Sequence, residues 1–120
     1  MPDAAMGVGI DLIEIERLEH ALERRPRLAQ RLFTEAELRY AREQARPGRH
    51  LAARFAAKEA VIKALGGVAV APSSIEIEGG GPPRVRLHGR AAELAGGRRI
   101  SVSLTHSRES AAAVALAAPG

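Results

Sequence analysis

The chain has 120 residues, a net charge of +4 and no cysteine. This length fits one domain, expected to span residues 1–120, and the lack of cysteine excludes disulfides and thiolate metal sites. The positive charge suggests an anionic partner, either nucleic acid, a phosphorylated ligand or an acidic protein, although three aromatic residues give little base-stacking platform. No apolar run approaches the ~20 residues that span a bilayer, and residues 1–6 lack the features of a signal peptide. We therefore expect a cytoplasmic protein without a membrane partner.

The first half of the chain is predicted to hold one strand and several helices. Residues 8–13 are apolar and rich in β-branched side chains, which favours a buried strand. The next helical spacing ends before Pro26, and the pair Thr34 and Glu37 is typical of a capping box that opens another helix. Pro47-Gly48 indicates a turn before the last helix. The predicted helices are residues 14–25, residues 34 to about 46, and a stretch that includes residues 51–65.

In the second half the apolar residues change from helical spacing to alternation. Two alternating stretches flank the turn residues Gly79–Pro83, which predicts a β-hairpin. The stretch 112–118 is ambiguous between helix and strand, and Val114 and Leu116 after a strand favour β. The predicted elements are strands at 75–78 and 85–88, a short helix at 91–94, and strands at 100–106 and 112–118. The expected fold is a single α+β domain, with an N-terminal strand and helices followed by an antiparallel sheet.

The helix that ends at Gly66-Gly67 is apolar on both sides yet keeps four charged residues. Glu59 and Lys63 are one turn apart in the orientation that favours an ion pair, which accounts for two of the charges. Arg54 and Lys58 are also one turn apart but have the same sign, so they repel unless an anion lies between them. Two cations beside a carboxylate would also suit a phosphate with a divalent metal, because Mg²⁺ is usually held by one or two carboxylates, substrate phosphates and water.

Two polar residues in predicted strands are further candidates, and each also has a structural interpretation. Asp11 lies in an apolar strand, where a buried carboxylate needs an ion pair, hydrogen bonds or a metal. In the structural interpretation it lies at the end of the strand and caps the next helix. His106 continues the apolar face of its strand to the point where the strand ends. A histidine there is more often structural, although strand ends are common places for functional side chains. Three other histidines are predicted to lie on the surface without a role: His20, His50 and His88.

Three segments, in order and in register, resemble one family. Gly7–Arg17 is similar to a G-x-G-x-D signature, Arg54–Gly66 matches the pattern R-F-A-x-K-E-A-x-x-K-A-x-G at every fixed position, and Val102–His106 is similar to an S-[IL]-[ST]-H strand. Together they resemble the holo-acyl-carrier-protein synthases, the small 4'-phosphopantetheinyl transferases of the bacterial cytoplasm, over nearly the whole chain. The resemblance implies the fold of that family, in a trimer whose active sites are shared between neighbouring subunits.

The resemblance also implies a reaction and the residues that perform it. The family transfers 4'-phosphopantetheine from coenzyme A to a serine of an apo acyl carrier protein and releases adenosine 3',5'-bisphosphate. By its pattern, Asp11 and Glu59 hold Mg²⁺ together with the pyrophosphate of coenzyme A. Lys63 is then expected to neutralise the pyrophosphate, and His106 to lie against the same phosphates. A water activated by Glu59 or by the metal is the expected acceptor of the serine proton, with His106 as the rival base.

Five further residues receive a role from the same resemblance. Arg54 and Lys58 match motif positions that are implied to bind the phosphates of coenzyme A or to support the site. A basic first helix docks the acidic helix of the carrier in this family, which maps here onto Arg17, with Arg24 and Arg25. The carrier protein, coenzyme A and two further copies of the chain are therefore the expected partners.

One departure from the family and one alternative remain at this stage. The hairpin turn reads Gly81-Pro82-Pro83 where many relatives have G-K-P. The contact that this lysine would make with coenzyme A is therefore either absent or replaced by one from Arg84. The alternative from another class is a small basic nucleic-acid-binding domain. It accounts for the charge but not for Asp11 and Glu59, because carboxylates repel phosphates unless a metal intervenes. A nucleic-acid partner is therefore not expected.

Overall fold

The computed structural model describes residues 6–120, so most of the segment in which no signal peptide was expected lies outside the described residues. None of the helices between residues 6 and 120 has the length and apolarity to cross a membrane. In chain order the elements are β1 Gly7–Glu14, α1 Ile15–Arg24, α2 Leu28–Leu32, α3 Glu35–Arg42, α4 Pro47–Ala64, a 3₁₀ turn η1 Pro72–Ser74, β2 Ile75–Glu78, β3 Arg84–Leu87, α5 Gly89–Ala95, β4 Arg99–His106 and β5 Ser110–Ala118.

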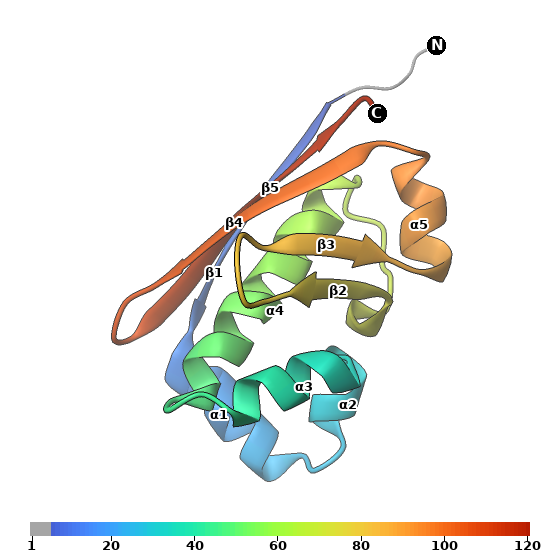
Figure 1. Cartoon of the computed structure of the whole chain (residues 1–120). Coiled ribbons are helices and arrows are strands. Elements are labelled where there is room, and N and C mark those ends of the chain that lie inside the picture. The colour runs from blue at the N-terminus through green and yellow to red at the C-terminus, as the bar shows by residue number, and fades with distance from the viewer. Residues whose placement is uncertain (1–5) are drawn as a thin grey trace.

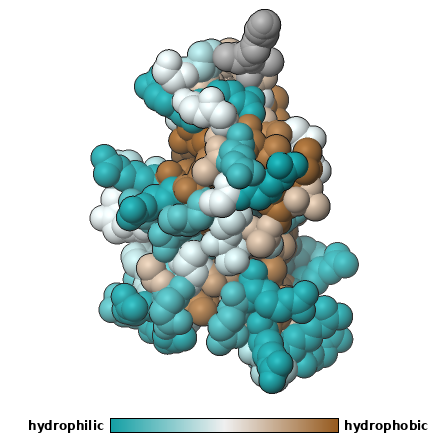
Figure 2. All heavy atoms as spheres, turned by 90° about the vertical axis from the view of Figure 1, so that its right-hand side faces the viewer, coloured by the Kyte–Doolittle hydropathy of each residue, from teal (hydrophilic) through white to brown (hydrophobic). Residues whose placement is uncertain are grey.

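Helix α4 is the centre of the molecule and separates two layers (Figure 1). One face packs on an antiparallel three-stranded sheet with the order β1-β5-β4. Across this sheet Asp11 lies opposite Ala113, which lies opposite Leu104. On its other side α4 meets the β2–β3 hairpin, and α1, α2 and α3 gather at one end of the molecule (Figure 1). Figure 2 shows hydrophilic residues concentrated at that end.

Small side chains bring α4 and the sheet close together. The buried face of β5 consists of alanines at every second position, and the facing surface of α4 is also rich in alanine. Because neither surface carries long side chains, the helix backbone lies near the strands, and larger residues from the hairpin and β4 fill the rest of the core. The alanines in this contact are Ala56, Ala57, Ala60 and Ala64 of α4, and Ala113, Ala115 and Ala117 of β5.

Most predicted elements are confirmed, including the capping box, the hairpin and the strand character of residues 112–118. The backbone N–H of Glu37 donates to Thr34 Oγ1 at 3.2 Å, and the backbone N–H of Thr34 donates to Glu37 Oε1 at 2.8 Å. The turn predicted at Pro47-Gly48 is wrong, because these residues form the first turn of α4, where proline needs no hydrogen-bond donor. Helix α3 ends at Arg42, before the predicted boundary, and the short α2 was not predicted.

Strand β1 differs from the prediction in one respect that bears on function. It was expected to be buried, but in the single chain only one of its faces is covered, by α4. Val8, Ile10 and Leu12 on the other face are 69%, 68% and 71% exposed. The alternate residues, which include Gly9 and Asp11, face α4. The prediction of a buried strand is therefore wrong for the outer face of a lone chain.

Candidate active site

Two glycines bring strand β1 against α4 and so position Asp11. A Cβ atom at Gly7 would overlap the carbonyl oxygen of Ala64, and a Cβ at Gly9 would overlap the carbonyl oxygen of Ala60. Any side chain at these positions would push the strand away from the helix. The G-x-G-x-D signature therefore has a steric reason: glycines at the first two positions allow the approach that sets the carboxylate of Asp11 beside α4.

Asp11, Glu59 and Lys63 form the first group of site residues. Lys63 Nζ donates to the carbonyl oxygen of Ile10 at 2.9 Å and lies 3.4 Å from Asp11 Oδ1. Asp11 therefore has a partner in α4 and does not cap α1, whose N-cap residue is Glu14. The ion pair of Lys63 is made with Asp11 across the strand–helix contact, and not with Glu59 along the helix, as the local interpretation had it.

Burial raises the pKa of Glu59 above its ordinary value of 4.5, the neighbouring Asp11 carboxylate raises it further, and Lys63 lowers it. Lys63 pairs with Asp11 while the second carboxyl group, Glu59, lies nearby, so the group contains two acidic side chains and one ammonium. Such a donor set fits Mg²⁺, which needs only one or two protein carboxylates when substrate oxygens and water complete the shell. Within residues 6–120 there is no cluster of three or more acidic, histidine or cysteine side chains that could hold a metal by itself.

The side chains of Asp11 and Glu59 line a pocket of about 550 Å³ between β1, α1, α2 and α4. Its walls are largely apolar, with Leu18 and Phe55 among them, and Arg17 also lines it. Arg17 is thus the docking candidate that lies beside the carboxylates. Arg24 and Arg25 are exposed at the far end of α1.

Arg54 belongs to a second group on the hairpin side of α4. Its side chain is only 6% exposed, and its guanidinium carbon lies 4.4 Å from the centre of the Tyr40 ring. Arg54 Nε is buried and has no hydrogen-bond partner among the described residues. A pocket of about 320 Å³ opens here, lined by Arg54, Tyr40 and the hairpin turn Gly79–Gly81. A buried cation with an unused donor, beside glycines that carry no side chains, is suited to an anion.

His106 also belongs to this second group. It ends β4 and is exposed, and its ring lies 6.0 Å from that of His50. Asp11 and His106 lie on the two outer strands of the sheet, with β5 between them. The chain therefore brings Asp11, Glu59 and Lys63 together and places Arg54 and His106 in a separate group.

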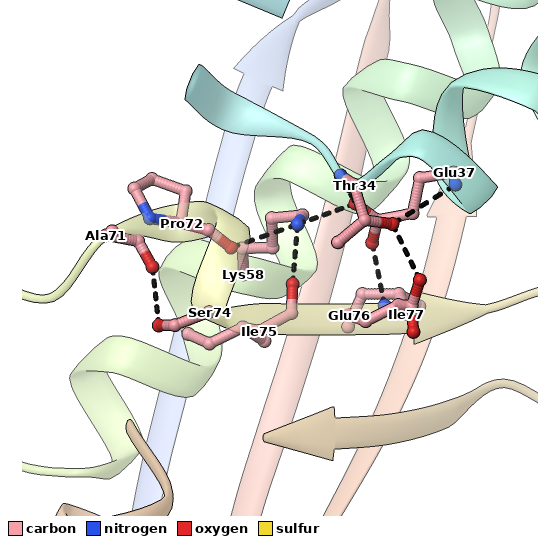
Figure 3. A network of polar contacts seen from close by, with 9 residues as sticks. All are labelled: Thr34, Glu37, Lys58, Ala71, Pro72, Ser74, Ile75, Glu76 and Ile77. Atoms are coloured by element: carbon pink, nitrogen blue, oxygen red, sulfur yellow. Dashed lines mark hydrogen bonds and ion pairs between the residues drawn. The ribbon is translucent and has the colours of Figure 1, made fainter. Parts of the chain in front are cut away.

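Lys58 joins neither group (Figure 3). Its side chain is completely buried, with Nζ 2.7 Å from Glu37 Oε1, and it donates to the carbonyl oxygens of Pro72 and Ile75. Glu37 Oε2 accepts the backbone N–H of Ile77 at 2.7 Å. Burial lowers the pKa of Lys58, and the Glu37 carboxylate opposes that shift. The charge of Lys58 is thus balanced by Glu37, so no anion between Lys58 and Arg54 is needed to explain it.

Sequence reasoning missed three residues that contact the predicted site residues. Glu37 was interpreted only as a helix cap, yet it also neutralises Lys58. Tyr40 was given no role, and His50 was predicted to be a surface residue, whereas it is partly buried between Tyr40 and His106. One signal was present: His50 and Arg54 are four residues apart and so share a face of α4.

Comparisons with known proteins agree with the resemblance drawn from the motifs. Residues 7–115 match the family model of the 4'-phosphopantetheinyl transferase superfamily. The chain is 56% identical to a holo-[acyl-carrier-protein] synthase of Moorella thermoacetica over 116 residues, 90% of each chain. The same enzyme of Streptomyces coelicolor is 49% identical, over 93% of this chain and 96% of that one.

Two solved structures show the same fold as this chain. Acyl carrier protein synthase of Mycobacterium tuberculosis has a TM-score of 0.79 and 43% identity, over 94% of this chain and 97% of that one. The synthase of Bacillus anthracis, solved in complex with coenzyme A (3',5'-ADP), has a TM-score of 0.80 and 32% identity, over 97% of this chain and 100% of that one. The expected family and the expected fold are both confirmed.

Proposed function

The chain belongs to the 4'-phosphopantetheinyl transferase superfamily, and we propose that it is a holo-[acyl-carrier-protein] synthase in which residues 1–120 form one transferase domain. It transfers 4'-phosphopantetheine from coenzyme A to a serine of an apo acyl carrier protein, in a Mg²⁺-dependent reaction that releases adenosine 3',5'-bisphosphate. The observation that carries the proposal is the group in which Asp11 and Glu59, from β1 and α4, lie beside the Lys63 ammonium.

In the proposed reaction the serine oxygen attacks the β-phosphorus of coenzyme A. An oxygen–phosphorus bond forms, the bond from that phosphorus to the bridging oxygen breaks, and adenosine 3',5'-bisphosphate leaves with the bridging oxygen. Charge increases on the phosphoryl and bridging oxygens, so positioning and electrostatic stabilisation are the main requirements. Lys63 supplies a fixed positive charge for this purpose. Mg²⁺, held by Asp11 and Glu59, would polarise the phosphoryl oxygens and orient the two phosphates.

The serine proton must be removed by a base of suitable strength. We propose that a water molecule activated by Glu59 or by the metal accepts it. His106 is the rival base and a contact for the phosphates.

The nucleotide end of coenzyme A is assigned to the second group. Arg54 has a buried, unpaired Nε beside an open pocket, which supports its proposed contact with a phosphate. The glycine turn lines the same pocket without the lysine that many relatives carry there, and Arg84, at the start of β3, is the proposed replacement. For Lys58 we propose support of the site and not phosphate contact, because its ammonium is fully buried and paired.

We further propose that the enzyme is a homotrimer. The outer face of β1 and β5 carries exposed apolar side chains next to one another, and contiguous apolar surface of this kind usually marks an interaction site. Sharing a site between neighbouring copies would combine the Asp11 group of one subunit with the His106 group of another. The exposed apolar residues are Val8, Ile10, Leu12, Val114 and Leu116.

The carrier is proposed to dock on α1 through Arg17, with Arg24 and Arg25, all of which are exposed. Their positive charges suit an acidic helix, and Arg17 borders the pocket that holds the two carboxylates. A serine presented there would be close to the proposed reaction centre. Coenzyme A and carrier proteins are both found in the cytoplasm of bacteria, the proposed location of the enzyme.

Mass spectrometry of an apo carrier protein incubated with this protein, coenzyme A and Mg²⁺ tests the proposal. The expected result is addition of one phosphopantetheine arm, lost when the metal is chelated and lost in Asp11→Asn. Glu93→Gln, which changes an exposed carboxylate on α5, serves as the matched control and should retain the activity. A wild-type protein that adds no arm to any apo carrier would refute the proposed function.

A further inference from the structure

Four side chains form a continuous row from α3 through α4 to the end of β4. The Arg54 guanidinium stacks on Tyr40, and the Tyr40 ring lies 5.9 Å from His50 at an interplanar angle of 76°. His50 in turn lies 6.0 Å from His106 at 67°. Both ring pairs are edge-to-face contacts at separations where aromatic rings attract one another. The row therefore joins the two proposed phosphate-binding residues, Arg54 and His106, through His50 and Tyr40.

His50 is the member of this row whose ring contacts that of His106. His106 is exposed at the end of β4, where the chain leaves the sheet. An exposed imidazole at a strand end has several rotamers available, and fixing one of them before substrate binds removes an entropic cost of binding. His50 projects from a rigid helix and is itself held by Tyr40, so it can restrict the His106 ring.

The charge state of His50 suits this contact. Burial lowers its pKa below the ordinary value of 6.5, and the nearby charges of Arg54, His106 and Arg49 lower it further. The groups that face it are thus Tyr40 from α3, Arg49 and Arg54 from α4, and His106 from β4. The lowered pKa favours the uncharged His50 ring, which can lie beside the Arg49 and Arg54 guanidinium groups without repelling them.

We propose that His50 is a positioning residue for the binding of coenzyme A. The His50 ring fixes the His106 imidazole, and through Tyr40 the Arg54 guanidinium, in the orientation that receives the phosphates of the nucleotide. This inference rests on the proposed function and deepens it, because it adds a residue that acts through others and not on the substrate itself. An aromatic ring of similar size should perform the same role, whereas a methyl group should not.

Steady-state kinetics of His50→Ala and His50→Phe in the full chain test the inference, with His88→Ala as the control at an exposed histidine outside the row. Loss of an edge-to-face contact between two aromatic rings corresponds to a change of about three- to tenfold in an equilibrium constant. We therefore expect KM for coenzyme A to rise by about that factor in His50→Ala, with kcat and KM for the carrier within about twofold. His50→Phe should restore KM, and His88→Ala should leave it unchanged.

A second measurement does not depend on turnover. The His106 ring-proton resonances in the NMR spectrum should shift in His50→Ala, because the neighbouring ring is lost, and thermal unfolding verifies that each variant is folded. A wild-type KM in His50→Ala, an unmoved His106 resonance, or equal impairment in His50→Phe and His50→Ala would each overturn the inference. A wild-type protein without transferase activity would instead overturn the proposed function, so the two failures are distinguishable.

Discussion

Helix α4 carries two lysines, five residues apart, that meet carboxylates in opposite ways. Lys58 is fully buried, 2.7 Å from Glu37 Oε1, with two backbone carbonyls as further acceptors. Lys63 has a side chain that is 54% exposed and lies 3.4 Å from Asp11 Oδ1. The first ammonium has used all three of its donors, whereas the second can still receive a ligand. The comparison separates a lysine that holds the fold from one that is available for chemistry.

The largest expected effect comes from leaving the buried ammonium without its partner. Glu37→Leu should lower the free energy of unfolding by about 3–5 kcal/mol, because an unpaired buried charge remains. The double variant Glu37→Leu, Lys58→Met should recover a large part of that loss, since both charges are then removed. Urea denaturation measures each value. If the double variant is no more stable than Glu37→Leu, burial of an unpaired charge is not the cause.

Lys63→Met should have a large effect on activity and only a small effect on stability. The Lys63 side chain is 54% exposed and that of Asp11 21%, so the free energy of unfolding should fall by about 1 kcal/mol, well below the loss in Glu37→Leu. Transfer to the carrier, however, should fall by about 100- to 1,000-fold in kcat, as for other losses of a fixed charge at a transition state. Lys58→Met is the matched control on the same helix and should lose stability. Unchanged kcat in Lys63→Met would remove this residue from the catalytic group.

Gly9→Ala should act on both properties at once. A Cβ at this position would overlap the carbonyl oxygen of Ala60, so β1 must move away from α4 and take Asp11 with it. We expect a loss of about 1–3 kcal/mol in the free energy of unfolding, accompanied by weaker Mg²⁺-dependent transfer. Gly81→Ala has open space around its Cβ and serves as the control for stability. Equal stability of the two variants would contradict the steric explanation of the signature.

The smallest effect concerns the charge of Glu59 in the absence of metal. Its folded pKa is raised, so between pH 4.5 and that raised value the folded protein binds more protons than the unfolded chain. The unfolding free energy of the metal-free protein should therefore decrease as pH rises through this window, and Glu59→Gln should remove the decrease. Added Mg²⁺ should raise Tm of the wild type at pH 7 but not of the variant. Equal shifts would contradict the metal assignment.

Local patterns in the sequence predicted most of the helices and strands. Capping, alternation and helical spacing act over a few residues, so the Thr34–Glu37 box and the hairpin could be found without a structure. The motif positions of Asp11, Glu59 and Lys63 were identified through the family resemblance. Their meeting follows from Gly7 and Gly9, whose purpose becomes visible only when α4 lies against β1.

The errors came from contacts between distant parts of the chain and from short segments whose local pattern is ambiguous. Lys58 was expected to need an anion because only its neighbours in α4 were considered, whereas its partner Glu37 lies 21 residues earlier. The five-residue α2 is too short to show a period, and Pro47-Gly48 is compatible with both a turn and a helix start. The outer face of β1 was expected to be covered, a condition that a single subunit does not meet.

The continuous course of α4 from Pro47 to Ala64 has a consequence for how this protein can vary. Successive residues of a helix are rotated by about 100° about its axis. Deleting one residue between Lys58 and Lys63 would therefore rotate one of the two lysines away from its contacts while the other kept its own. Substitutions in this segment change one contact at a time, but a change of length would alter the position of Lys58 in the interior relative to that of Lys63 in the proposed reaction centre. Natural variants should therefore differ here in residue type and never in spacing.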